Sequence, residues 1–188
     1  MKRSKLRLQY NSPVVLSFAL LSLGVLLLGW LTNNRSTVLL FSVYRAPLRN
    51  LLTWPRFFLH VLGHADFSHY INNMMMLLVV GPPLEEKYGS RSLLWAIGVT
   101  ALVSGLAQFI FFPNSVLLGA SGVVFMMIVM SSLAGMKEGT IPLTLVLVLV
   151  LYLGGEVVNG ITVRDNISQL THIIGGLCGA ALGFYLRR

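Results

Sequence analysis

Two residues in the apolar C-terminal half of the sequence have the side chains of a nucleophile and its base. Ser121 lies in the stretch VLLGASGVVFMM (116–127), and His172 lies in QLTHIIGGLCGAALG (169–183). A serine hydroxyl becomes a good nucleophile when a base accepts its proton, and a neutral imidazole is the usual base. A carboxylate often orients that imidazole, but none of the six acidic residues has a spacing that commits it to this role. The two residues therefore predict a Ser-His dyad that attacks carbonyl groups.

His69 and Asn73 have the hydrogen-bond donors that such a reaction needs. They are four residues apart in HVLGHADFSHYINN (60–73), which puts both on one face of a helix. Attack on a carbonyl generates an oxyanion, which fixed donors stabilise. If Ser121 begins a helix, free backbone N–H groups and the positive end of the helix dipole add to these donors. Singly, a serine or histidine in a membrane helix is more often a packing residue, but the four residues together near one membrane face favour catalysis.

The composition indicates that these residues belong to a membrane protein. Hydrophobic residues make up 55% and charged residues 11% of the 188, and the mean hydropathy is +0.78, whereas a soluble domain has about a quarter charged residues. The net charge of +8 comes from short basic clusters beside apolar runs, a pattern typical of topology signals rather than of a nucleic-acid surface. With a single cysteine, Cys178, and no C-x-x-C pattern, we expect no disulfide, no metal and no cofactor.

Six apolar runs approach the roughly 20 residues that cross a bilayer. They cover about 13–31, 68–84, 92–112, 119–136, 141–158 and 168–186. Nine Lys and Arg residues flank these runs on one side and five on the other, so both termini are expected in the cytoplasm. We expect an all-α, polytopic bundle of six transmembrane helices, with residues 1–12 as a cytoplasmic segment and 13–188 as one membrane domain. Ser12 is expected to cap the first helix, with Pro13 at its first position.

The first outer loop, about 32–67, is long for a connection without secondary structure. Its run 51–61 is rich in Leu, Phe and Trp and contains Arg56. Trp and Arg suit the headgroup level, so this run is expected to be an interfacial amphipathic element.

Glycines on the last apolar run place His172 against a neighbouring helix. Gly175, Gly179 and Gly183 follow His172 at intervals of three, four and four residues, and therefore share its helix face. Small residues at this spacing let membrane helices approach closely. Gly119 and Gly122 are likewise small residues on either side of Ser121. The runs 119–136 and 168–186 are therefore expected to pack together.

These motifs resemble those of the rhomboid intramembrane serine proteases, over roughly residues 51–188. GASG (119–122) resembles the family's Gly-x-Ser-Gly nucleophile motif, HIIG (172–175) matches its His-x-x-Gly, and HYINN (69–73) matches its His-x-x-x-Asn. The motifs occur in the order and on the spans that the family has.

Further positions also resemble the family, two of them with a departure. His64 falls where the family has a structural histidine, and EKYGS (86–90) is similar to its Glu-Lys-x-x-Gly-Ser. WPR (54–56) looks like the family's Trp-Arg loop motif with a proline inserted. Phe125 stands where the family often has a tyrosine that packs on the catalytic histidine.

The resemblance implies a six-helix bundle with Ser121 as nucleophile and His172 as general base. His69, Asn73 and the Ser121 backbone N–H would form the oxyanion hole. Substrates would be single-span or polytopic membrane proteins, cut in or near a transmembrane segment. We expect a multi-pass protein of a bacterial inner (plasma) membrane with no nucleic-acid partner. The residues expected to support the site are His64, Gly119, Gly122, Phe125, Gly175, Gly179, Glu86 and Arg56.

Two other classes of protein compete with this interpretation. A non-proteolytic rhomboid-like protein that binds transmembrane clients would use the same fold and the same glycines. A proton-coupled transporter would need ionisable residues at mid-membrane on several helices, whereas the polar residues here gather near one face. The joint presence of Ser121, His172, His69 and Asn73 favours the protease.

Overall fold

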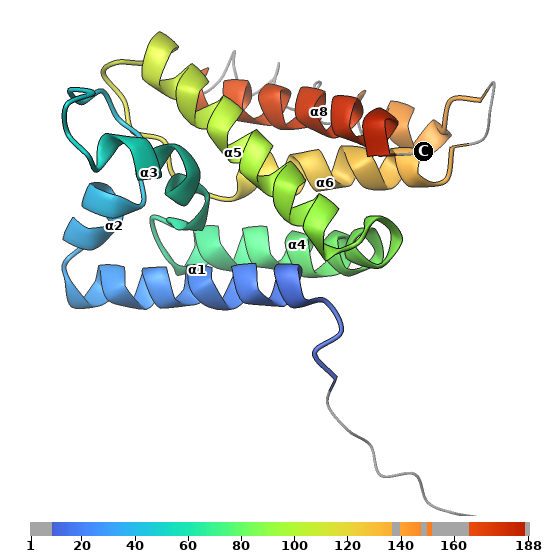
Figure 1. Ribbon diagram of the computed structural model, residues 1–188, viewed down its shortest axis with the longest axis horizontal. Helices are drawn as coiled ribbons and strands as arrows, with labels where there is room; N and C mark the ends of the chain where they lie inside the picture. The colour runs from blue at the N-terminus through green and yellow to red at the C-terminus, as the bar shows by residue number, and fades with distance from the viewer. Residues whose placement is uncertain (1–8, 137–139, 148–149, 152–165, 187–188) are drawn as a thin grey trace, which may run out of the picture.

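The chain forms an all-α bundle, as the apolar runs predict (Figure 1). The computed structural model describes residues 9–136, 140–147, 150–151 and 166–186. Long helices in this part of the chain are α1 (Pro13–Leu31), α4 (Phe67–Tyr88), α5 (Ser90–Phe111), α6 (Ser121–Ala134) and α8 (Asn166–Leu186). Two short helices, α2 (Arg35–Leu40) and α3 (Thr53–Leu59), and the 3₁₀ turn η1 (His60–Leu62) lie at one end of the bundle.

Two of these helices, α1 and α5, are long and apolar enough to cross a membrane by length and composition. Helix α6 and residues 170–186 of α8 are apolar but shorter. The run expected at 141–158 lies largely outside the described residues, where residues 143–147 are helical. The count of six spans therefore stays a prediction.

Helix α6 is the central element of the bundle. Its sequence is apolar on all sides, as expected of a helix enclosed by protein, and every residue from Gly122 to Met127 is buried. It packs against α4 on one side and α8 on the other, and its contact with α8 is the most extensive between any two described elements (Figure 1).

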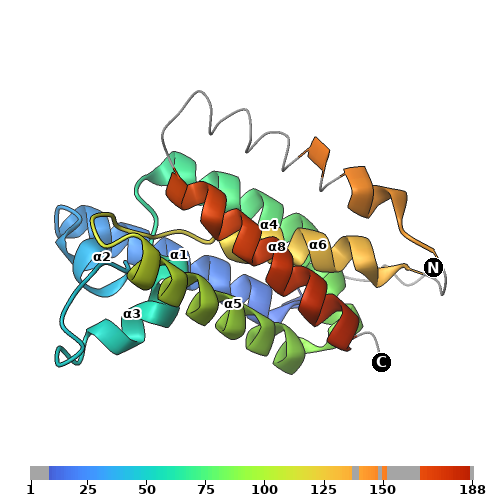
Figure 2. The same ribbon diagram turned by 90° about the horizontal axis from the view of Figure 1, so that it is seen from above.

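The antiparallel arrangement of the helices places the starts of three of them at the same end of the bundle. Helices α4, α6 and α8 begin at the end of the bundle where α1 and α5 finish, beside α2 and α3 (Figure 2). This topology brings residues near positions 69, 121 and 172 to one end of the molecule, although they are far apart in the sequence.

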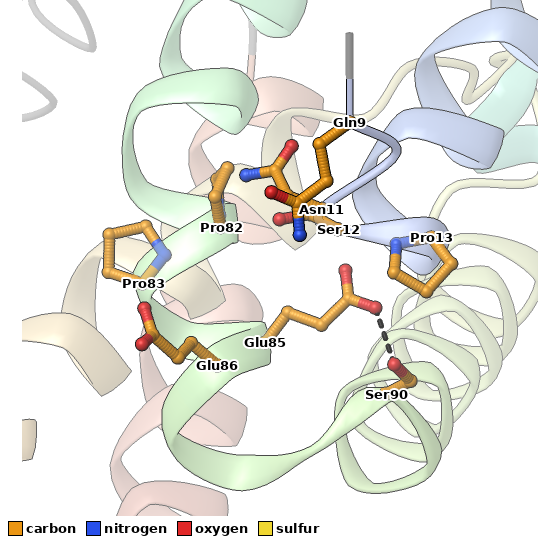
Figure 3. A pocket seen from close by; sticks show the side chains of 9 residues that line it. All are labelled: Gln9, Asn11, Ser12, Pro13, Pro82, Pro83, Glu85, Glu86 and Ser90. Carbon is orange, nitrogen blue, oxygen red and sulfur yellow. Dashed lines mark hydrogen bonds between the residues drawn. The ribbon is translucent and has the colours of Figure 1, made fainter. Parts of the chain in front are cut away.

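At the opposite end, a carboxylate rather than Ser12 caps the first helix. Ser12 occupies the N-cap position before Pro13, but its side chain makes no capping hydrogen bond. Instead, the Glu85 carboxylate accepts hydrogen bonds from the backbone N–H of Val14 (2.9 Å) and Val15 (3.0 Å). It also accepts one from the Ser90 hydroxyl (2.6 Å), beside a polar cavity of about 410 Å³ (Figure 3). A carboxylate at this position also interacts favourably with the helix dipole.

Glu85, rather than its neighbour Glu86, makes these contacts. Glu85 is 4% exposed, whereas the Glu86 side chain is exposed. The reason is that α4 continues through Pro82 and Pro83 to Tyr88. Its buried face contains Gly81, Leu84 and Glu85, and the next residue is turned about 100° away.

Arg56 is enclosed by protein, although the run that contains it was expected to be interfacial. The run 51–61 does form α3 and η1, and Trp54 is exposed. Arg56, however, lies on the buried face of α3 and is only 1% exposed. Its Nε donates a hydrogen bond to the Leu39 carbonyl (2.7 Å), and its Cζ lies 4.4 Å from the centre of the Tyr44 ring.

Candidate active site

Asp66 fixes the start of α4 and, with it, the positions of His69 and Asn73. The Asp66 side chain accepts a hydrogen bond from the His69 backbone N–H (2.8 Å), which is an N-cap. Asn73 follows one turn later on the same helix face and is 7% exposed. Its Nδ2 donates to the His69 carbonyl (2.8 Å). Since an amide nitrogen carries two hydrogens, this bond occupies one of them.

The irregular segment 112–120 leads to Ser121 and is hydrogen-bonded to the outer loop. Leu117 forms an antiparallel bridge with Val43, with hydrogen bonds of 2.8 and 2.9 Å. The Gly119 N–H then donates to the His60 carbonyl (2.9 Å). Ser121 follows as the first residue of α6 and is half-buried. Its position at a helix start, expected from the sequence, is therefore observed.

Gly119 brings the His69 ring close to Ser121. Its φ of +122° is one that side-chain-bearing residues rarely adopt. A Cβ placed on Gly119 would lie 2.7 Å from His69 Cε1 and 2.8 Å from His69 Nε2. The imidazole therefore rests on backbone two residues before Ser121, and only glycine leaves room for it.

Helix α8 packs on α6 through the glycine face that contains His172. A Cβ on Gly175 would collide with the Gly122 carbonyl, so the two backbones are in direct contact there. A Cβ on Gly122 would in turn lie 2.9 Å from Thr171 Cγ2 and 3.2 Å from the Thr171 carbonyl oxygen. Because Gly122 follows Ser121 and Thr171 precedes His172, this contact brings the starts of the two helices together.

Phe125 occupies the space beside His172. The two ring centres are 6.2 Å apart with 59° between their planes. Gly176 makes this possible, because a Cβ there would lie 2.8 Å from Phe125 Cε1. The aromatic contact expected at this position is thus present without a tyrosine hydroxyl.

Two further histidines, in the segment just before α4, are buried. His64 is 0% exposed, its Nδ1 lies 3.1 Å from the Leu62 carbonyl oxygen, and its ring centre is 5.1 Å from that of His69. His60 is 1% exposed, and its Nε2 lies 3.0 Å from the Ala101 carbonyl oxygen. Burial lowers the pKa of each ring to about 4. Both rings are therefore neutral at pH 7.

The sequence analysis did not identify a row of buried polar side chains on α5. Thr100, Ser104 and Gln108 are all buried, and their spacing of four residues puts them on one helix face. The Ser104 hydroxyl would lie 3.9 Å from a Cβ on Gly122. The Gln108 amide donates to the Ser115 hydroxyl (2.8 Å) in the segment that leads to Ser121. Their regular spacing within an apolar run was the signal that could have revealed them.

The site residues thus fall into two groups. Those near the starts of α4, α6 and α8 lie together: His64, His69, Asn73, Gly119, Ser121, Gly122, Phe125, His172 and Gly175. Gly179 lies further along α8, against Met126 and Val129. Glu86 is at the far end of α4, and Arg56 contacts the outer loop rather than this cluster.

Comparison with known proteins identifies one family. The Rhomboid domain matches residues 52–188. Rhomboid-related protein 1 of Caenorhabditis elegans is 33% identical over 144 residues, which cover 69% of this chain and 39% of that protein. Rhomboid protease GlpG of Pectobacterium atrosepticum is 28% identical over 181 residues, which cover 94% of this chain and 64% of that protein. The chain therefore matches between 39% and 64% of the length of these two relatives.

A relative of more similar length comes from Bacillus subtilis. Its putative rhomboid protease YdcA is 26% identical over 142 residues, which cover 71% of this chain and 67% of that protein. The Rhomboid domain match extends over well more than half of the sequence and includes all the candidate site residues. Together with its apolar helices, this match shows that the chain is an integral membrane protein that belongs to the rhomboid family.

Proposed function

We propose that the chain is an intramembrane serine protease that hydrolyses peptide bonds in or near transmembrane segments through a Ser121–His172 dyad. The observation that carries this proposal is the backbone contact between α6 and α8 at Gly122 and Gly175. It joins the two helices next to the residues that have the chemistry of nucleophile and base. Several relatives are named as proteases, including GlpG and GluP.

In the proposed reaction, His172 accepts the proton of the Ser121 hydroxyl while Oγ attacks the substrate carbonyl carbon. The tetrahedral intermediate then collapses, the C–N bond breaks, and the imidazolium gives its proton to the leaving amine. Water, activated by the same imidazole, hydrolyses the resulting acyl-enzyme and restores the free serine.

The oxyanion of the intermediate would be stabilised by backbone and side-chain donors. The first N–H groups of α6 are free of intrahelical partners, and they lie at the positive end of the helix dipole. The His69 ring rests on Gly119 beside them. Asn73 would use the amide hydrogen that it does not donate to the His69 carbonyl.

In the proposed arrangement, six helices span a bacterial inner membrane and both termini lie in the cytoplasm. Residues 1–12 would be a cytoplasmic segment, and 13–188 would form one domain. Substrates would be membrane proteins with one or several spans. A helical peptide bond is hydrogen-bonded and shielded, so its segment must unwind before attack.

The proposal is tested with the purified chain in liposomes and a panel of tagged transmembrane segments. The wild type should cleave at least one segment, while Ser121→Ala and His172→Ala should each remove cleavage and stay folded, because the dyad acts as a unit. Ser131→Ala, an exposed serine on the same helix, is the matched control. Cleavage by purified Ser121→Ala at the wild-type rate would overturn the assignment. Binding of the segments without cleavage by the wild type would instead support a non-proteolytic client-binding protein.

A further inference from the structure

Arg56 carries a buried charge whose donors are only partly used. Its side chain is 1% exposed and makes one hydrogen bond, from Nε to the Leu39 carbonyl. Both terminal nitrogens, Nη1 and Nη2, are buried without a hydrogen-bond partner among the described residues. A buried charge normally has a partner, because an unpaired one is costly to remove from water. The guanidinium therefore has four N–H groups available to an anion.

The Tyr44 ring covers this guanidinium, and Tyr44 lines two surface cavities. One cavity, of about 450 Å³, is lined by residues that include Arg35, Leu39 and Tyr44. The other, of about 330 Å³, is lined by residues that include Tyr44 and Arg45. The two residues that contact Arg56, Leu39 and Tyr44, are thus cavity-lining residues. Arg56 itself lines neither cavity, so the Tyr44 ring would have to move before an anion in either one could reach the guanidinium.

The charge around these cavities is entirely positive among the residues that line them. Arg35 and Arg45 are both exposed, and Arg45 is held in place by a hydrogen bond from Nη1 to the Phe109 carbonyl (2.8 Å). No acidic side chain lines either cavity. Guanidinium groups bind phosphate oxygens well because their planar N–H groups match the geometry of two oxygens.

The site is also at the end of an apolar helix, which is the level at which a bilayer presents phosphate groups to a spanning helix. It comprises α2, Tyr44 and Arg45 in the segment after α2, Arg56 of α3 and residues 113–116, and α2 lies at the end of the apolar helix α1 (Figure 2). The exposed apolar side chains of Val38 and Val116 line the same cavities as the two exposed arginines. Arginines beside exposed apolar groups at the end of a membrane helix are typical of the headgroup level.

We propose that Arg35, Arg45 and Arg56 bind the phosphate group of a phospholipid, with the Tyr44 ring as a movable cover over Arg56. The lipid's acyl chains would lie along the exposed apolar side chains of α2. The proposal concerns the outer loop alone and does not depend on the proteolytic activity.

Native mass spectrometry of the full chain, delipidated in detergent and titrated with dioleoylphosphatidylglycerol, tests this site. The wild type should retain this lipid and should not retain dioleoylglycerol, which has the same chains without the phosphate. Arg35→Gln and Arg45→Gln should each weaken binding about fivefold, the usual effect of one basic residue at an anionic lipid surface. Arg49→Gln removes the same charge from an exposed arginine of the same loop that lines neither cavity, and it should leave binding unchanged.

Two variants address the buried part of the site. Arg56→Gln should weaken lipid binding more than either exposed variant, and Tyr44→Ala should strengthen it because the guanidinium is then uncovered. If Arg56→Gln does not fold, the comparison of Arg35→Gln and Arg45→Gln with Arg49→Gln still decides the matter. Equal binding by all three of these variants would overturn the proposal, as would equal retention of dioleoylglycerol. Displacement of the lipid by millimolar inorganic phosphate would overturn the assignment to a phospholipid.

Discussion

Replacement of Gly179 by alanine tests whether the α6–α8 contact positions the dyad. A Cβ at this position would lie 2.5 Å from the Met126 carbonyl oxygen and 2.9 Å from Val129 Cβ. Ordinary contact begins at 3.4 Å, so the helices must separate by about 0.9 Å, because the opposing oxygen belongs to the backbone and cannot rotate away. Gly179 lies roughly 10 Å along α8 from His172, at a rise of 1.5 Å per residue.

The expected consequence has two parts. Overpacking of this kind costs about 1–3 kcal/mol of stability, and a displacement of about 1 Å between catalytic groups can lower the rate on the order of 10²-fold. We therefore expect Gly179→Ala to lower kcat strongly while it touches no catalytic atom. The assay is cleavage of a transmembrane segment in liposomes, together with thermal unfolding in detergent.

Gly98→Ala is the matched control for this prediction. Gly98 lies inside helix α5, and a Cβ there meets nothing within 4 Å. The substitution should leave activity unchanged and should not destabilise the protein, because alanine is the better helix former. Activity of Gly179→Ala within about twofold of the wild type would mean that the geometry of the dyad does not depend on this helix contact.

Three further predictions concern other parts of the molecule. His69→Ala and Asn73→Ala should each lower kcat with KM nearly unchanged, by up to the order of 10²–10³-fold seen for one oxyanion donor; an effect on KM alone would assign them to substrate binding. Glu85→Ala should cost about 3 kcal/mol, because it leaves one buried and two part-buried donors without their acceptor, whereas Glu86→Ala should change stability by less than about 0.5 kcal/mol. The free energy of unfolding should fall as the pH drops from about 6.5 towards 4. In this range the His60 ring of the unfolded chain binds a proton, whereas the buried ring of the folded chain, with its pKa of about 4, stays neutral. The unfolding temperature should decline over this range, and His60→Gln should reduce the decline; a flat profile in the wild type would contradict the argument.

The helices could be predicted from the sequence because their signals are local. The first apolar run gave the bounds of α1 correctly, since Pro13 fixes its start. The last run lies within α8, and its glycine spacing correctly indicated the face that packs on α6. Such patterns depend only on helical periodicity and on the close approach that glycine permits.

The contacts that cross between elements could not be predicted in this way. Glu85 and Glu86 are neighbours in the sequence, and only the continuation of α4 through two prolines decides which is buried. Arg56 lies in a run with the composition of an interfacial element, yet the packing of Leu39 and Tyr44 encloses its side chain. At the candidate site, the four chemically active residues were identifiable by type, whereas their depth depends on the irregular segment before Ser121 and on the outer loop.

The shortness of α6 gives the outer loop a further task. A helix of 14 residues is about 21 Å long, roughly 9 Å less than a hydrocarbon core of about 30 Å. In the proposed six-span arrangement, the irregular backbone before Ser121 would cover the remaining depth, and such backbone is tolerated in a bilayer only where protein satisfies its polar groups. Val43 and His60 do this for the amides of Leu117 and Gly119. The outer loop therefore supplies the hydrogen-bond acceptors that water would otherwise provide to the segment before Ser121. A shortened loop would leave those amides without acceptors in the lipid.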